Sequence, residues 1–178
     1  MDVAVGGPVG RAVQRSAGRR AVLARAAARG AAGGLAGAAA MALGQRAERA
    51  LTGRPASYVR GRTLLILLGR SPGDDERPAA ATAAMDLVTG VALGALRGVW
   101  RASGLVAVRA DVVQTLTRVI VDQTLENATG AGAPPRTWQR GEGVVEVLHA
   151  AVAAIATGAV VERLVEPVLE SRRGTGSH

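Results

Sequence analysis

Glycines recur at four-residue intervals in two segments of the sequence, and this spacing constrains the fold more than any other feature. The first segment holds the pairs Gly30/Gly34 and Gly33/Gly37, and the second holds the triplet Gly90, Gly94 and Gly98. Residues four apart share one face of a helix, and glycine there lets a second helix backbone approach closely. An interior glycine costs about 1 kcal/mol relative to alanine. We therefore predict that these glycines mediate helix packing, either within the chain or between copies in a homo-oligomer.

The rest of the sequence predicts an all-α bundle of about four to five Ala/Gly-rich helices with no sheet. Apolar residues follow the helical period, and no alternation of apolar and polar residues persists. Glycine is the residue that most often ends a helix. The predicted helices are 11–51, 58–68, 79–103, 110–129 and 142–170, and the first four are closed by Gly53, Gly69, Gly104 and Gly130. In the fourth helix, one face carries Val112, Val113, Leu116, Val119 and Ile120, and the opposite face carries Gln114, Thr117, Arg118 and Gln123.

The chain divides by charge into an Arg-rich N-terminal segment (1–29, partly helical), a single helical bundle (30–170) and a disordered tail (171–178). All 22 cationic side chains are Arg, and the net charge is +8. Such an excess favours an anionic partner. We predict that anionic lipid head groups bind the six arginines of the first segment, which are Arg11, Arg15, Arg19, Arg20, Arg25 and Arg29.

Missing residue types exclude several kinds of chemistry. Without cysteine there is no disulfide, thiolate nucleophile, Cys-ligated zinc or iron–sulfur cluster, and without lysine there is no Schiff-base amine. His178 belongs to the polar tail, which leaves His149 as the one imidazole in a predicted helix. We expect no enzymatic activity and no cofactor. Nucleic-acid binding is also not expected, because the few aromatic residues that could stack on bases are scattered.

Polar residues inside the apolar helices are the candidates for a site. Asp86 lies in an apolar helix, where a carboxylate is a candidate ion or proton relay. Its partner, an arginine or His149, must come from another helix. Glu146 and His149 are three residues apart on one predicted helix, and Asp122 and Glu126 are four apart on another. Carboxylate-bridged metal bundles use such spacings, but they need more ligands than one histidine supplies. We therefore treat the five residues as a polar or ion site and expect no metal. The enzyme-class alternative is a mononuclear metal site formed by Asp122, Glu126, Glu146 and His149.

The membrane and water-soluble alternatives both stay open from the residues alone. The apolar segments 30–45, 79–96 and 147–161 are short for a hydrocarbon core of about 30 Å. Both flanks of 30–45 are basic, which conflicts with the positive-inside rule if that segment crosses a membrane. The glycine spacing favours close helix packing in lipid. The alternative is a soluble, cytoplasmic helical bundle that acts as a binding or scaffold module for an acidic partner such as anionic lipid or nucleic acid.

Three stretches carry a resemblance to a known family. They are DQTLENATGAGAPPRTW (122–138), RPASYVRGRTLLILLGRSPGDDER (54–77) and VVEVLHAAVAAIATGAVVERLV (144–165). Together they resemble an uncharacterised family of small multi-helix integral membrane proteins from bacteria, common in actinobacteria. The resemblance implies a location in the bacterial cell membrane and brings no catalytic residue with it.

Overall fold

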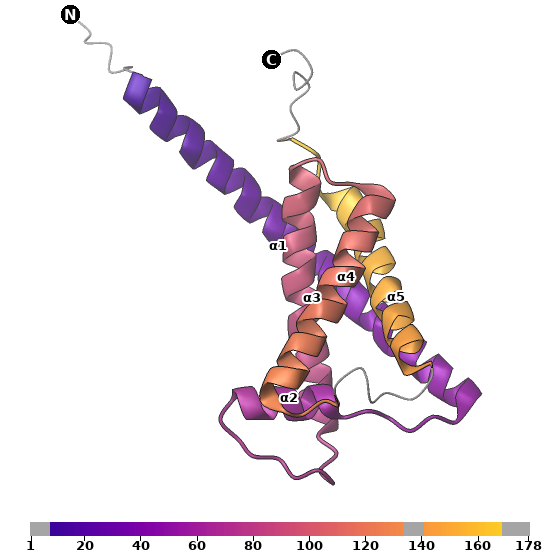
Figure 1. The fold of residues 1–178 in the computed structure, drawn as a ribbon. Helices are drawn as coiled ribbons and strands as arrows, with labels where there is room; N and C mark the ends of the chain where they lie inside the picture. Colours follow the sequence, from indigo (N-terminus) through magenta and orange to yellow (C-terminus); the bar gives the residue numbers. More distant parts are fainter. Residues whose placement is uncertain (1–7, 134–140, 169–178) are drawn as a thin grey trace, which may run out of the picture.

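The computed structural model describes residues 8–133 and 141–168, which form α-helices and, within these ranges, no strand. The helices are α1 (Pro8–Thr52), α2 (Val59–Leu67), α3 (Ala79–Ala102), α4 (Ala107–Thr129) and α5 (Glu142–Leu164). Helices α3, α4 and α5 lie alongside one another, and the C-terminal half of α1 packs against α3 and α5 (Figure 1). The short α2 lies at the end of the bundle where α3 begins. The predicted all-α fold is confirmed.

Four of the predicted helix ends are reproduced within a few residues. Gly53 follows α1 with φ +70° and Gly130 caps α4 with φ +72°, a left-handed conformation that glycine adopts without a Cβ clash. The predicted end of the last helix was wrong, because α5 stops at Leu164 and not at residue 170. Val165 is already extended, at φ −125° and ψ 123°. Pro167 explains the early stop, because its ring would clash with the carbonyl four residues earlier in a continuing helix.

Helix α1 is one continuous helix of 45 residues, about 67 Å long at 1.5 Å per residue. Its N-terminal part projects away from the bundle (Figure 1). The predicted division between residues 29 and 30 therefore falls inside a single helix. The predicted tail, 171–178, lies outside the described residues.

The predicted glycines pack helices together within the chain. Gly30 and Gly34 of α1 contact the backbone of α3, where Gly94 is so close that a Cβ on it would lie 2.6 Å from the Gly34 nitrogen. Gly33 and Gly37, on a second face of α1, contact α5, where a Cβ on Gly37 would lie 2.7 Å from the Ala153 carbonyl oxygen. Gly90 and Gly98 complete the contact between α1 and α3. Interdigitated glycines thus bring α1 into backbone contact with two helices.

Helix α4 buries its polar face and exposes its apolar face. Gln114, Arg118 and Asp122 are buried against the other helices. Leu116 is 56% exposed and Ile120 is 63% exposed, and Val112 and Val113 point outward with them. This orientation is the reverse of the one found in a water-soluble bundle, where the apolar stripe faces the core.

Helices α3 and α5 are each long and apolar enough to cross a membrane. They have 24 and 23 residues, and their most apolar 18-residue windows have mean hydropathies of 1.6 and 2.0. At 1.5 Å per residue they extend about 36 Å and 34 Å, compared with a hydrocarbon core of about 30 Å. The predicted segments 79–96 and 147–161 fell short because α3 and α5 continue beyond them, to Ala102 in α3 and from Glu142 to Leu164 in α5.

Candidate functional site

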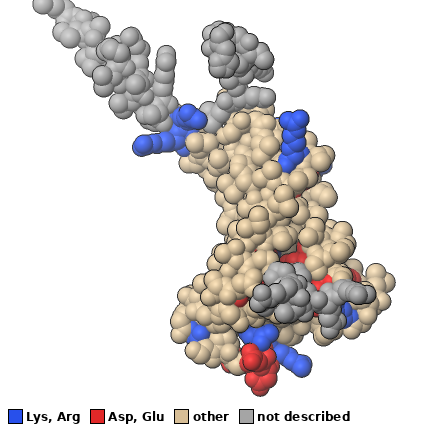
Figure 2. Space-filling model, viewed as in Figure 1, with Lys and Arg blue, Asp and Glu red and all other residues tan. Residues whose placement is uncertain are grey.

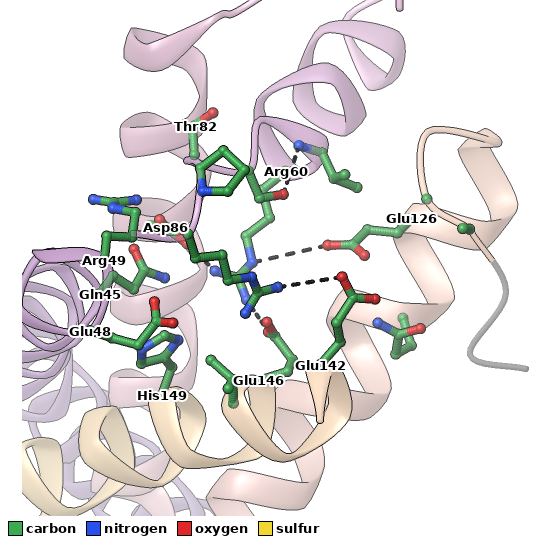
Figure 3. A pocket seen from close by; sticks show the side chains of 18 residues that line it. Gln45, Glu48, Arg49, Arg60, Thr82, Asp86, Glu126, Glu142, Glu146 and His149 are labelled. Carbon is green, nitrogen blue, oxygen red and sulfur yellow. Dashed lines mark hydrogen bonds and ion pairs between the residues drawn. The ribbon is translucent and has the colours of Figure 1, made fainter. Parts of the chain in front are cut away.

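Helix α2 brings an arginine into the bundle. Gly61 lies against the start of α3, where a Cβ at this position would be 2.7 Å from the carbonyl oxygen of Pro78. Only a residue without a side chain permits this approach. The preceding residue, Arg60, consequently reaches between α3, α4 and α5 (Figure 3).

Four carboxylates from three helices surround the Arg60 guanidinium. Asp86 Oδ1 of α3 lies 3.2 Å from Nη1, and Asp122 Oδ2 of α4 lies 3.4 Å from Nη2. Glu126 of α4 is 4.0 Å from Nε, and Glu146 of α5 makes the shortest contact. Hydrogen bonds to ionised partners are roughly twice as strong as neutral ones. Arg60 therefore ties α2 to the three longer helices of this end of the bundle.

A second buried guanidinium, that of Arg118, lies beside the first. Its Nη2 is 3.1 Å from Asp86 Oδ1, and its Nε is 3.3 Å from Asp122 Oδ2. Both aspartates thus bridge the two arginines. The side chains of Arg118 and Asp122 are only 3% and 2% exposed, so these charges depend on one another for solvation. We call Arg60, Arg118 and the four carboxylates the charge cluster.

Burial and the carboxylates act in opposite directions on Arg60. Removal from water would lower the pKa of the guanidinium, but Glu146, Asp122, Asp86 and Glu126 together outweigh this effect and raise its pKa above the ordinary value. A raised pKa means that the folded state favours the charged form, and its contribution to stability would be lost only as the pH rose through that value. Arg60 is therefore a fixed cation at every pH at which proteins normally fold.

A cavity of about 300 Å³ adjoins the charge cluster. The described residues of its wall include five carboxyl groups, three guanidinium groups and one imidazole. Figure 3 shows these side chains converging from α1, α2, α3, α4 and α5. The charged and titratable lining residues are Glu48, Arg49, Arg54, Arg60, Asp86, Glu126, Glu142, Glu146 and His149.

The structure brings the five predicted site residues together but builds no metal site from them. Asp86, Asp122, Glu126 and Glu146 all contact Arg60, and His149 lines the adjoining cavity. Among the described residues, no group of three or more potential ligands could hold a metal ion. The guanidinium stands at the centre of the carboxylates, so the predicted polar site is an arginine-centred cluster.

Sequence reasoning missed the two arginines. It predicted that Asp86 pairs with an arginine or with His149 from another helix, without saying which arginine, and the partners prove to be Arg60 of α2 and Arg118 of α4. A usable signal existed for Arg118, which lies opposite the apolar face of its helix. For Arg60 the sequence offers only an arginine near the start of a short apolar helix, which is also the pattern of a solvated residue.

A third buried arginine lies toward the other end of the bundle. The side chain of Arg97 in α3 is 1% exposed, and its Nη2 lies 2.7 Å from Asp111 Oδ1 of α4 and 3.7 Å from Glu162 Oε1 of α5. Glu162 also accepts a hydrogen bond of 2.8 Å from the backbone nitrogen of Ala107, at the start of α4. This ion pair network fastens the turn between α3 and α4 to α5.

Comparisons with known proteins give no relative from which a role could be transferred. No protein-family model, curated protein or solved structure matches the chain. The resemblance to a family of small bacterial membrane proteins therefore stays a prediction, and the function has to be argued from the geometry.

Proposed function

We propose that this chain is an integral protein of the bacterial cell membrane, a non-enzymatic helical bundle held together by glycine contacts and buried ion pairs. The observation that carries the proposal is the orientation of α4. Its buried side is polar and charged, and Leu116 and Ile120 face outward. Lipid favours this arrangement because apolar side chains can face lipid at no cost in free energy. Charged groups, by contrast, must pair in the interior of the bundle.

The other long helices support the same proposal. Large apolar side chains are exposed along α1, α3 and α5, at Leu35, Leu43, Leu87, Val88, Leu96, Val144, Val147, Leu148, Val152 and Ile155. In α3 and α5, only 28% and 33% of the most apolar window is buried. The core helix of a soluble protein is mostly buried, and an apolar surface this extensive is costly in water. In the proposal, α1, α3, α4 and α5 cross the membrane.

The buried charges fit the proposal because each has a partner of opposite sign. A charged side chain in a membrane-spanning helix faces the interior of the bundle and pairs there. Arg118 and Asp122 do so on α4, and Arg97 does so on α3. We assign no catalytic role to the carboxylates of the charge cluster, because they are held in ion pairs with arginine.

The distribution of charge supports one orientation. Among the residues whose side chains the structure describes, the end of the bundle at which α3 finishes carries eight arginines and three carboxylates, and the opposite end carries eight arginines and nine carboxylates. The arginines of the first end are thus the less neutralised ones, and basic residues are attracted to the anionic cytoplasmic leaflet. The proposal therefore places the first end, with exposed Arg19, Arg20, Arg25 and Arg29, on the cytoplasmic side. Figure 2 shows arginine side chains at this end and both signs of charge at the other.

The same four exposed arginines support the predicted contact with anionic lipid. They lie on α1 near the level where the helix leaves the bundle (Figure 1). Basic residues at the membrane surface each contribute about 1 kcal/mol of attraction to an anionic leaflet. The side chains of Arg11 and Arg15, which belong to the same prediction, lie outside the described part of the structure.

Carbonate extraction of membranes from cells that express the untagged chain tests the proposal. An integral protein stays in the pellet and is released only by detergent. Recovery in the carbonate supernatant would overturn the proposal and favour the alternative, a soluble helical module that binds an acidic partner. A known peripheral protein, measured in the same fractions, serves as the control for complete extraction.

A further inference from the structure

The buried side of α4 carries a column of polar residues along most of the helix. They recur at intervals of three or four residues, which places them on one side of the helix. The members of the column are Asp111, Gln114, Arg118, Asp122 and Glu126. At 1.5 Å per residue the column extends about 22 Å, compared with a hydrocarbon core of about 30 Å. Polar side chains therefore follow one another through most of the thickness of the bundle.

Ion pairs with carboxylates occupy both ends of this column. At one end Asp111 pairs with Arg97, and the side chains of Asp111 and Glu162 are 25% and 38% exposed. At the other end Asp122 belongs to the charge cluster, of which Glu126 lines the cavity. Each end thus holds carboxylates that are open to exchange of protons with the surroundings.

The middle of the column holds buried polar atoms without a partner. Between Asp111 and Arg118 its one buried polar residue is Gln114, which is 3% exposed and whose side-chain oxygen accepts no hydrogen bond from the described residues. Nε and Nη1 of Arg97, whose partner Asp111 is one turn from Gln114, are also buried and donate none to them. Most buried polar groups bond to protein or to ordered water. Water both donates and accepts, so it satisfies the oxygen and the two nitrogens alike.

We propose that this column is a path for protons, in which bound water beside Gln114 links the pair of Arg97 and Asp111 to the charge cluster. The inference rests on the proposed function, because such a path has a use only where the bundle crosses a membrane. A carboxylate at one end takes up a proton and becomes a carboxylic acid. The proton then passes along the water, and a carboxylate at the other end releases it, so every group returns to its starting state. Ionisable residues inside membrane helices mark such relays.

The arginines of the path favour protons over metal ions. The guanidinium groups of Arg60, Arg97 and Arg118 are fixed positive charges that repel metal cations, and at least two carboxylates contact each of them. A proton moves by successive transfers between water and carboxylates and needs no space for a hydrated ion. Among the described residues, no group of three or more potential ligands could hold a metal ion.

Proton flux into liposomes that contain the purified full chain tests the inference. Liposomes of phosphatidylcholine and phosphatidylglycerol are loaded with potassium and the pH dye pyranine, and they are then diluted into sodium buffer. Valinomycin lets potassium leave, and the negative interior draws protons inward. We expect the interior to acidify faster than in liposomes without protein.

Substitutions at Gln114 test the central step. Gln114→Met removes the amide at nearly constant volume and is expected to lower the protein-dependent flux about tenfold, because the hydrogen-bonding group that holds the water is gone. Gln114→Glu keeps hydrogen-bonding oxygens at this position and is expected to retain the flux. Thr124→Val is the matched control, because Thr124 is exposed on the same helix. It is expected to leave the flux unchanged.

The outcomes separate this inference from the proposed function. Flotation of the liposomes after a carbonate wash shows whether the chain is inserted, and a chain that washes off overturns both. If an inserted chain gives no flux above that of liposomes without protein, or if Gln114→Met conducts as well as the unaltered chain, the inference fails and the proposed function stands. Release of trapped carboxyfluorescein by the unaltered chain would mean general leakage and would also overturn the inference. Circular dichroism checks the folding of each variant. If Gln114→Met does not fold, the flux and the dye release of the unaltered chain still decide the question.

Discussion

Gly158 of α5 lies directly against the guanidinium of Arg97 in α3. A Cβ at Gly158 would stand 2.6 Å from Nη2 of Arg97 and 2.7 Å from Oδ1 of Asp111. The absence of a side chain at one position thus makes room for an ion pair between two other helices, whose arginine is fully buried. Glycine in this bundle creates space for charge as well as for close backbone contact.

The first prediction concerns this pair. Gly158→Ala is expected to destabilise the protein by about 1–3 kcal/mol, because the added methyl group overpacks the site and displaces the guanidinium. When Arg97 is first replaced in the variant Arg97→Met, the flexible methionine side chain can move aside. Gly158→Ala is then expected to lower the free energy of unfolding by less. Thermal unfolding followed by circular dichroism measures both costs. Equal costs in the two backgrounds would show that Arg97 and Gly158 are not coupled.

The second prediction concerns the contact between α1 and α3. Gly34→Ala is expected to lower the unfolding midpoint clearly, because its Cβ would collide with the backbone of Gly90, which cannot move as a side chain can. Gly44→Ala, in the same helix, is the matched control. A Cβ at Gly44 would have its nearest neighbours at 3.9 Å. Alanine also has a higher helix propensity than glycine. The prediction fails if the two variants unfold alike.

The third prediction concerns the charge cluster. Arg60→Met removes one of the two cations of the cluster and leaves four carboxylates with Arg118 alone, with an expected loss of about 3 kcal/mol in the free energy of unfolding. The double variant with Glu146→Gln is expected to recover part of that loss, since one negative charge is gone. Arg62→Met is the control, because the partner of Arg62, Asp74, is exposed and such pairs contribute about 0–1 kcal/mol. Denaturant unfolding measures all three, and a loss no greater than that of the control would contradict the role given to Arg60.

The fourth prediction separates lipid from water as the surroundings of α4. Ile120→Arg places a charge on the outward face, which costs about 2.5–3.5 kcal/mol near the centre of a membrane helix. The fraction of the chain that resists carbonate extraction is therefore expected to fall. Leu68→Arg, at an exposed position after α2, is expected to have no such effect. If Ile120→Arg instead leaves extraction unchanged and improves solubility, α4 faces water.

The fifth prediction concerns orientation, and the chain is well suited to the measurement because it contains no cysteine. Single cysteines at Gly18 and Ser71 lie at opposite ends of the bundle. Intact cells, whose outer layers have been made permeable to the reagent, are treated with a maleimide that cannot cross the cell membrane. We expect it to label the Ser71→Cys variant only. Gly18→Cys is expected to react after the membrane is opened. The reverse pattern would mean that the arginine-rich end faces outward.

Local residue chemistry was enough to predict most of the helices and their packing glycines. The periodicity of α4 revealed its two faces, but it could not reveal which of them points inward, because that depends on whether the surroundings are water or lipid. The end of α5 was misjudged because Pro167 was placed inside the helix and not beyond it. Periodicity and capping are local properties, and these are the features that a single sequence carries most directly.

The centre of the candidate site could not be predicted, for a physical reason. Asp86 and Arg60 are 26 residues apart and meet only because Gly61 lets α2 lie tightly against the start of α3. Glu146, in α5, lies 86 residues after Arg60 in the sequence. Contacts at such separations follow from the tertiary arrangement and leave no mark in the spacing of neighbouring residues.

The separation of Arg60 from its partners also sets an order of assembly. On the ribosome, Arg60 emerges first, Asp86 follows with α3, and Glu146 is added only when α5 is made. Until then the guanidinium has an incomplete set of anions to hold α2 against the longer helices. The cluster is thus completed only when α5, which follows its other contributing helices in the sequence, has been made.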